Sequence, residues 1–355
     1  KVAFSNATAF VDGSSWISGF ATDKDALISD FNNDGLADVG YWEKDSGKWS
    51  YAISTGVKFV DKGVWLDSFG QNSDESATTG DFNGDGITDA ATFDRDQLGI
   101  NRWSTRLSTD RPADLLTEIE NGIGGKTQVV YTYAAQNDNS NLPFPVYVAS
   151  SISLVNTAPV DRVAIYTQDF IFSGGYYDAA EREFRGFAKV KVTDSITNNY
   201  SETYFYQGSA GQDGALKGQI DKVIAYDGNN RQVSSSLNTY EVKKSGSSDK
   251  FLGFPALTEQ TTTFYEENGK YIKTKNDYTY DNIGNVLEAK NNGLTDNNLG
   301  ISNEGDEKST ATTYAQAYET GFNRSLESSL KDQDGNIVTK KNFEYDNKGN
   351  LTKET

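Results

Sequence analysis

The chain has 355 residues, of which 51 are acidic and 33 basic, so its formal net charge is −18. This charge repels phosphate backbones and anionic lipids, which disfavours binding to nucleic acid or to a membrane surface. The chain contains no histidine and no cysteine, which excludes Ser-His-Asp triads, Cys-His pairs, histidine-ligated zinc and disulfides. No apolar run is long enough to span a bilayer. The absence of methionine, with Lys1 in first place, predicts a processed piece of a longer protein.

Two short segments share a pattern of oxygen-bearing side chains. They are Asp30-Phe-Asn-Asn-Asp-Gly-Leu-Ala-Asp38 and Asp81-Phe-Asn-Gly-Asp-Gly-Ile-Thr-Asp89. Ca²⁺ takes about six to eight oxygen ligands, and a glycine at the sixth position lets such a loop bend around the ion. The sequence therefore predicts two calcium sites, in preference to plain acidic turns. The expected ligands are Asp30, Asn32, Asp34, the carbonyl of Leu36 and Asp38 in the first loop, and Asp81, Asn83, Asp85, the carbonyl of Ile87 and Asp89 in the second.

The residues after each loop distinguish between helical and strand contexts. An EF-hand needs a bidentate glutamate at the twelfth position, where this chain has Tyr41 and Thr92. Dockerin-type helical repeats need an oxygen ligand near the same place. The chain continues instead into β-branched, small and aromatic residues, 39–42 and 90–93, which predict strands.

The loops belong to a longer repeat of about fifty residues. Trp16-Ile-Ser-Gly-Phe20 precedes the first loop and Trp65-Leu-Asp-Ser-Phe69 precedes the second. Between the loops, residues 40–56 predict a strand, an Asp-Ser-Gly turn and a second strand. The unit resembles the FG-GAP (VCBS) repeat of β-propellers, and only about two of the roughly four to eight blades of a propeller are present. We expect four tryptophans to fill blade cores: Trp42, Trp49, Trp65 and Trp103.

The composition changes near Arg111, after which short β-branched and aromatic runs alternate with Gly, Asn and Asp. Residues 114–133 predict two strands around a glycine-rich turn. Further strands are predicted over residues 163–173, 187–194, 199–206, 219–226 and 271–280. Residues 309–330 are compatible with a short helix or with another hairpin.

A different motif recurs near the end of the chain, in Tyr280-Asp-Asn-Ile-Gly-Asn285 and Tyr345-Asp-Asn-Lys-Gly-Asn350. The Asp can bond the turn backbone and the Gly can adopt positive φ, so each copy predicts a hairpin. Asp334-Gly-Asn-Ile337 is a related turn, and Tyr226-Asp-Gly-Asn-Asn-Arg-Gln-Val233 is a degenerate copy.

The Tyr-Asp-x-x-Gly-Asn hairpins resemble the YD, or RHS, repeat. They follow the FG-GAP-like units and a middle segment that includes Asp114-Leu-Leu-Thr-Glu-Ile-Glu-Asn-Gly-Ile-Gly124, Pro143-Phe-Pro-Val-Tyr-Val148 and Gly174-Gly-Tyr-Tyr-Asp-Ala-Ala-Glu-Arg-Glu-Phe-Arg-Gly-Phe187. In this order, the three parts resemble the B component of bacterial insecticidal toxin complexes and the related plasmid-virulence RHS proteins.

The resemblance implies an all-β fold in three parts: calcium-binding propeller blades over residues 1–110, a toxin-complex middle region over 111–215, and an RHS/YD hairpin shell over 216–355. It implies a secreted or cell-surface protein that is not an enzyme. In such complexes the propeller docks onto a pore-forming A component, and the shell encloses a toxic effector carried by the C component. The Asp-Pro-x-Gly-Leu type of self-cleavage segment that ends many RHS shells is missing.

Two rival functions are compatible with the same residues. A cell-surface adhesin, or a glycan-binding propeller that contacts a host glycan or protein, would use the same calcium loops and exposed aromatic residues. A glycosidase would need paired carboxylates. The pairs Glu118/Glu120 and Glu181/Glu183 are better explained as solvated hairpin faces, and we expect Arg182, Glu183 and Arg185 to form a charged surface. Gly124-Gly125-Lys126 lacks the spacing of a phosphate loop.

Overall fold

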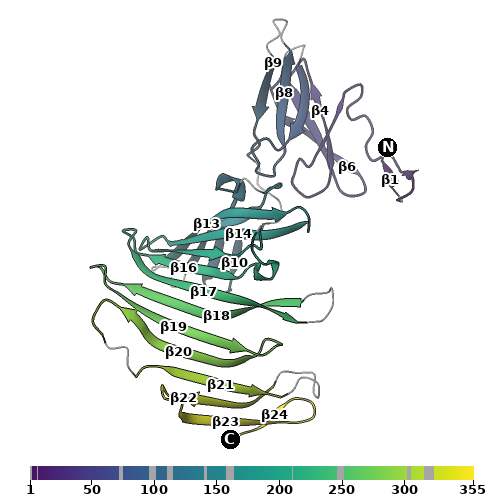
Figure 1. Ribbon diagram of the computed structural model, residues 1–355. Helices are drawn as coiled ribbons and strands as arrows, with labels where there is room; N and C mark the ends of the chain where they lie inside the picture. The colour runs from purple at the N-terminus through teal and green to yellow at the C-terminus, as the bar shows by residue number, and fades with distance from the viewer. Residues whose placement is uncertain are drawn as a thin grey trace. The chain divides into compact units, whose positions relative to one another are not determined.

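The computed structural model describes residues 2–5, 7–71, 75–95, 101–109, 115–139, 142–156, 164–209, 211–245, 252–301, 305–315 and 324–355. These residues form antiparallel strands and two 3-10 helices, η1 (Ala134–Gln136) and η2 (Gly214–Leu216) (Figure 1). The predicted all-β class is confirmed. The described strands do not close into a propeller ring. In the same residues, no helix has the length and apolar character needed to cross a bilayer.

The chain divides into two compact units. The first contains residues 1–119, 131–136 and 143–148, and the second contains 120–130, 137–142 and 149–355. The predicted change of composition at Arg111 lies outside the described residues. The division into three parts at residues 110 and 215 stays a prediction.

The first unit contains three small antiparallel sheets in which strands adjacent in sequence are neighbours. One hairpin pairs β1 (Ala3–Ser5) with β2 (Phe10–Asp12). The four-stranded sheet consists of β3 (Ala26–Ser29), β4 (Asp38–Glu43), β5 (Lys48–Ser54) and β6 (Phe59–Leu66). The three-stranded sheet consists of β7 (Glu75–Gly80), β8 (Asp89–Arg95) and β9 (Asn101–Arg106).

Aromatic residues pack the core of the four-stranded sheet, as expected for three of the four tryptophans. Trp49 is 1% exposed, and its ring lies 6.1 Å from Trp42 and 6.3 Å from Trp65. The indole N–H groups of Trp42 and Trp49 both donate to the carbonyl of Phe69. The prediction for Trp103 is wrong, because this side chain is 61% exposed.

The remaining sheet is long, and its strands follow one another in chain order from β10 to β24 (Figure 1). Its strands are β10 (Glu118–Glu120), β11 (Gly125–Tyr133), β12 (Tyr147–Asn156), β13 (Ala164–Asp178), β14 (Glu183–Asp194), β15 (Tyr200–Phe205), β16 (Ile220–Tyr226), β17 (Gln232–Ser245), β18 (Leu252–Tyr265), β19 (Tyr271–Tyr280), β20 (Val286–Asn297), β21 (Lys308–Tyr314), β22 (Ser325–Lys331), β23 (Ile337–Tyr345) and β24 (Leu351–Glu354). The predicted strands are confirmed wherever they are described. In the segment 309–330, the described parts form β21 and β22, which pair as a hairpin instead of a helix.

The predicted hairpin turns connect these strands in one repeated geometry. Asp281, Asp332 and Asp346 each donate their backbone N–H to the carbonyl of an Asn four residues later, at 3.0 Å. The Asp Oδ1 accepts that Asn's backbone N–H, and the Asn side-chain amide bonds the Asp Oδ2. Sequence reasoning placed the middle turn at Asp334, whereas the structure begins it at Asp332.

These turns predict a dependence on pH. The side-chain amides of Asn336 and Asn350 are the main reason that the pKa values of Asp332 and Asp346 lie below the ordinary aspartate value. The folded turn therefore favours the carboxylate, and this stabilisation is present at neutral pH and lost as the pH falls below about 4. We expect the exchange protection of the Asn336 and Asn350 amides, measured by NMR, to fall in that range. The variants Asp332→Asn and Asp346→Asn should show no such fall. Equal acid sensitivity in the variants would contradict this.

Candidate functional site

Each Asp-rich loop connects two strands of a small sheet, as the residues after the loops predicted. The first loop joins β3 to β4 and the second joins β7 to β8. The residue at the sixth position has positive φ in both loops, +82° at Gly35 and +78° at Gly86. Because strands flank both loops, the helical EF-hand and dockerin contexts are excluded.

The first aspartate of each loop organises the loop backbone. The Asp30 carboxylate accepts the N–H groups of Asp34 and Gly35, and the Asp81 carboxylate accepts those of Asp85 and Gly86. A second aspartate in each loop also accepts a backbone N–H group. Asp34 Oδ1 accepts the N–H of Leu36, and Asp85 Oδ1 accepts the N–H of Ile87. The two loops therefore share one pattern of hydrogen bonds from the first and fifth residues, while the ninth residue is the first of the following strand.

The ninth residue of each loop has a role that sequence reasoning did not foresee. Asp38 and Asp89 are fully buried. Asp38 accepts backbone N–H groups from Phe31 at 2.9 Å and from Ser54 at 2.6 Å. Asp89 accepts the equivalent pair, Phe82 at 3.0 Å and Ser108 at 2.7 Å. Each carboxylate thus connects its loop to a residue 16 or 19 positions later, Ser54 at the end of β5 or Ser108 just after β9.

The loops have partial features of a cation site. In the described residues, no group of three or more acidic side chains converges as a metal cluster, so an ion would have to use amide and carbonyl oxygens as well. Asn32 Oδ1 is a buried oxygen with no hydrogen-bond partner. Burial raises the pKa of Asp38, and the nearby Asp34 and Asp30 carboxylates raise it further against the opposing N–H bonds. A hard cation in this loop would offset these carboxylate charges and accept the free Asn32 oxygen as a ligand.

Two further contacts link the loops to other parts of the first unit. The Thr88 hydroxyl, in the second loop, donates to the carbonyl of Asp30 at 2.6 Å and lies 2.7 Å from the Ser29 hydroxyl. The Tyr147 hydroxyl donates to the carbonyl of Asp85. Burial, with the nearby Asp85 and Asp81 charges, raises the pKa of Tyr147 to about 12. The sequence motif 143–148 contains Tyr147, but it did not predict this contact with the second loop.

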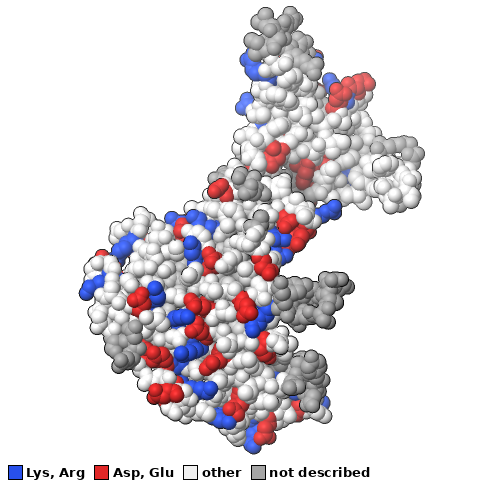
Figure 2. Space-filling view, in the orientation of Figure 1, with Lys and Arg blue, Asp and Glu red and all other residues white. Residues whose placement is uncertain are grey.

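The long sheet has faces of different chemistry. On one face of β14 to β16, Lys191 lies 3.8 Å from the Tyr200 ring centre, and Lys222 lies 4.4 Å from that of Tyr204. Tyr204 donates to Glu202 at 2.8 Å. Burial is the main cause that raises the pKa of Tyr204 to about 12. Figure 2 shows acidic and basic side chains interspersed over the same sheet.

On the opposite face, the central pairs of these strands are uncharged. Phe170 pairs with Val192 and Phe172 pairs with Val190. Further along the sheet, the same face carries the pairs Thr203 with Val223, Ser201 with Ala225, and Ser236 with Thr262. At these pairs the sheet therefore presents apolar and hydroxyl side chains on the face opposite Lys191 and Lys222.

A buried arginine holds one hairpin of this wall, contrary to the predicted exposed surface. The Arg185 side chain is 4% exposed. Its Nη2 lies 2.8 Å from Asp178 Oδ2 and 2.9 Å from Glu181 Oε2, and its Nη1 donates to the carbonyl of Gly208 at 2.5 Å. Lys217 extends the cluster through Glu183, at 2.6 Å. Arg182 is exposed as predicted.

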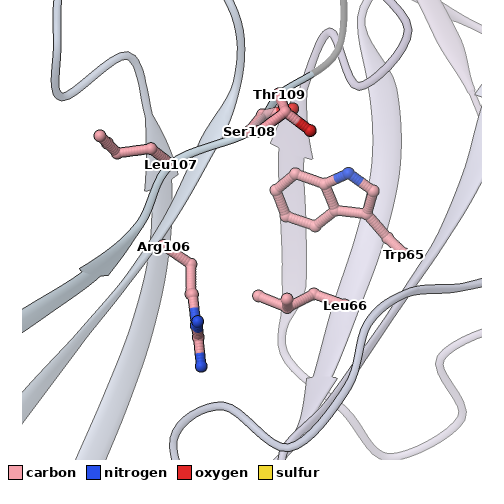
Figure 3. A pocket seen from close by; sticks show the side chains of 6 residues that line it. All are labelled: Trp65, Leu66, Arg106, Leu107, Ser108 and Thr109. Carbon is pink, nitrogen blue, oxygen red and sulfur yellow. The ribbon is translucent and has the colours of Figure 1, made fainter.

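The first unit also has a cavity of about 210 Å³, lined by the end of β6, the end of β9 and the segment after β9 (Figure 3). Its lining contains a single charged group, the Arg106 guanidinium, which lies 5.7 Å from the Phe69 ring centre. The lining residues are Trp65, Leu66, Arg106, Leu107, Ser108 and Thr109. This cavity places no acid beside a base.

These features define a class: an all-β protein with small loop-bearing sheets followed by one long antiparallel sheet that runs in chain order. We compared the chain with protein families and with proteins of known structure. Residues 48–210 match the family described as the insecticide toxin TcdB middle/N-terminal region. No curated protein matches the chain.

The fold is similar to that of solved toxin-complex structures. A crystal structure of TcdB2-TccC3 matches with a TM-score of 0.72 and 13% identity, over 90% of this chain and 21% of that chain. The same complex without its hypervariable C-terminal region matches with a TM-score of 0.70 and 14% identity, over 93% and 21%. A Tc holotoxin pore from Photorhabdus luminescens gives 0.71 and 13%, over 90% and 21%. The chain thus spans about a fifth of the length of these solved chains.

Proposed function

We propose that this chain is a non-enzymatic structural part of a secreted, toxin-complex type of protein. Its long sheet forms part of a shell that encloses a toxic effector. The observation that carries this proposal is the uninterrupted chain-order sheet β10 to β24, together with its match to TcdB2-TccC3. A single-layer sheet of this length has two broad surfaces and open edges, and winding it into a closed wall pairs those edges. The Asp-Asn turns correspond to YD repeats of this shell.

The proposed partners follow from the same argument. They are a pore-forming component, contacted through the small sheets as FG-GAP-type blades, and an effector-carrying component that closes the shell. A hollow closed particle in electron micrographs of the full-length protein would support the shell. Extended beads would support the adhesin alternative and contradict the shell. Turnover in glycan or peptide hydrolysis assays that is lost on changing one carboxylate would contradict the non-enzymatic part.

We further propose that Ca²⁺ binds both Asp-rich loops and stabilises the first unit. The first ion would be held by Asp30, Asn32, Asp34, Asp38 and the Leu36 carbonyl, and the second by Asp81, Asn83, Asp85, Asp89 and the Ile87 carbonyl. The buried, unpartnered Asn32 Oδ1 supports the first site. The ion would neutralise the crowded carboxylates and supply no chemistry of its own.

Calcium removal gives a direct test. All five tryptophans precede residue 104, so tryptophan fluorescence reports on the first unit. At a calcium concentration about five times Kd, the ion should stabilise this unit by about 1 kcal/mol. We expect EGTA to lower the melting temperature seen by fluorescence, and the double variant Asp34→Ala/Asp85→Ala to abolish the difference. An identical melt with EGTA and with millimolar calcium would refute the sites, and a calcium effect that persists in the variant would place the ion elsewhere.

A further inference from the structure

The cavity of about 210 Å³ in the first unit combines side chains that neither the proposed shell nor the proposed calcium sites use. β6 contributes Trp65 and Leu66, and the end of β9 with the segment after it contributes Arg106, Leu107, Ser108 and Thr109. Figure 3 shows Trp65 and Leu66 extending from β6 toward the segment after β9, whereas the Leu107 side chain points away from them. The cavity is therefore lined by an indole, an aliphatic side chain, one guanidinium and two hydroxyls.

Contacts outside the cavity hold two of its walls in place. The Trp65 ring packs edge-on against the Phe31 ring, with 4.9 Å between the ring centres. The backbone N–H of Ser108 donates to the buried Asp89 carboxylate at 2.7 Å, which fixes the segment after β9. A ligand would therefore enter a site that is already formed, and little of its binding free energy would be lost in ordering the protein.

Arg106 gives the cavity a positive charge. No carboxylate lines the cavity, and Arg106 forms no ion pair within the part of the chain that the structure describes. Its guanidinium lies 5.7 Å from the Phe69 ring centre. A guanidinium presents N–H donors in a planar fork that matches the two oxygens of a carboxylate. One such cation balances the single charge of a carboxylate, whereas a phosphate monoester carries a charge of about −1.5 to −2.

The remaining groups indicate what the carboxylate is attached to. The Trp65 indole N–H has no acceptor among the described residues, and Thr109 contributes a hydroxyl to the lining. A sugar ring has hydroxyls for such polar groups and a C–H face that packs on an aromatic ring, whereas a simple aromatic acid has only the apolar part. The volume lies below the roughly 300–1,000 Å³ of pockets for drug-sized ligands, so the cavity fits about one ring.

We propose that this cavity binds a uronic acid, a sugar that carries a carboxylate, as a single ring. The carboxylate accepts N–H groups of Arg106, and the ring packs against Trp65 and Leu66. The ring hydroxyls bond the Thr109 hydroxyl and the Trp65 indole N–H. The site contains no residue of the Asp-rich loops and does not depend on the proposed shell.

Two sugars that differ in the carboxylate alone provide the test. D-galacturonate is the probe, and D-galactose carries a hydroxymethyl group in its place. Binding to the full chain is titrated by saturation-transfer difference NMR without added calcium, because uronates chelate this ion. We expect a Kd of about 1 mM for galacturonate and binding weaker by about tenfold or more for galactose. Methyl α-D-galacturonoside mimics the end of a polysaccharide, so its affinity relative to the free sugar distinguishes a chain end from a free uronic acid.

Three variants assign the binding to the cavity. Arg106→Gln should weaken galacturonate binding about tenfold or more, because the amide has neither the charge nor the fork of donors. Thr109→Val should weaken it about fivefold through the loss of one hydrogen bond. Arg102→Gln changes an exposed arginine of the same strand that does not line the cavity, and it should leave the affinity unchanged. Tryptophan-fluorescence melts verify that the first unit of each variant is folded.

Four results would overturn the proposal. The first is the absence of saturation transfer to galacturonate at about 50 mM, far above the expected Kd. The second is equal affinity for galactose, which would remove the role of the carboxylate. The third is an equal effect of Arg106→Gln and Arg102→Gln, which would place the sugar elsewhere. The fourth is benzoate binding as tightly as galacturonate, which would make the ligand a simple aromatic acid.

Discussion

Replacing Arg185 with methionine is expected to destabilise the second unit by about 2–3 kcal/mol. The guanidinium is 4% exposed and connects the end of β13, the start of β14 and the segment after β15. Its removal leaves Asp178 and the Gly208 carbonyl without their cationic donor. Removing one partner of a wholly buried ion pair costs roughly 3–5 kcal/mol of stability. The expected loss is smaller here, because the side chains of Glu181 and Glu183 are 61% and 44% exposed and remain solvated.

The chain offers a matched control for this variant. Arg182 is an exposed arginine on the same turn, and Arg182→Met should change stability by less than about 0.5 kcal/mol. Urea-dependent hydrogen exchange of β13 to β15 measures the effect in the second unit. Tryptophan fluorescence should show an unchanged midpoint for the first unit. Equal effects of the two substitutions would mean that the buried ion pairs contribute nothing.

Replacing Asp38 with alanine is expected to destabilise the first unit by about 2–4 kcal/mol. The substitution leaves the N–H groups of Phe31 and Ser54 buried without an acceptor, and each such group costs about 1–3 kcal/mol. Asp38→Asn should be intermediate, because its side chain retains one acceptor oxygen and presents donors at the other position. The midpoint of urea unfolding followed by tryptophan fluorescence measures these differences.

Two comparisons make the Asp38 result specific. Asp45→Ala, in the exposed turn after β4, removes the same charge and should leave the midpoint nearly unchanged. Asp89→Ala should reproduce the Asp38→Ala loss, because Asp89 holds Phe82 and Ser108 in the same way. The experiment is run in EGTA, so that lost ion binding does not contribute. If Asp38→Ala behaved like Asp45→Ala, the buried carboxylate would have no structural role.

Strands and turns were predictable from sequence because their signals are local. The range 271–280 matches β19, and the Asp-x-x-Gly-Asn turns form as expected. A turn needs only a positive-φ glycine and an aspartate that bonds its own backbone, and both can be read within about five residues. The middle turn was placed at Asp334, whereas Asp332, two residues earlier, accepts the Asn336 N–H that closes it.

The roles of individual side chains were less predictable because they depend on distant segments. The burial of Arg185 requires Gly208, and the burial of Trp49 requires Trp65 and Phe69. The hydrogen bond from Thr88 to Asp30 joins residues 58 positions apart. The motifs indicated which residues form each Asp-rich loop. The fifty-residue repeat does not indicate which distant residues pack against a loop.

The chain-order arrangement of β10 to β24 has a consequence for folding. Each strand pairs only with the strands before and after it in the sequence, so closing each new pair requires only a short loop. Such a sheet can grow from one end, as repeat arrays do, with each added hairpin using the previous one as its template. A polypeptide that emerges gradually from a ribosome or a secretion channel can therefore assemble this wall while its remainder is still unfolded.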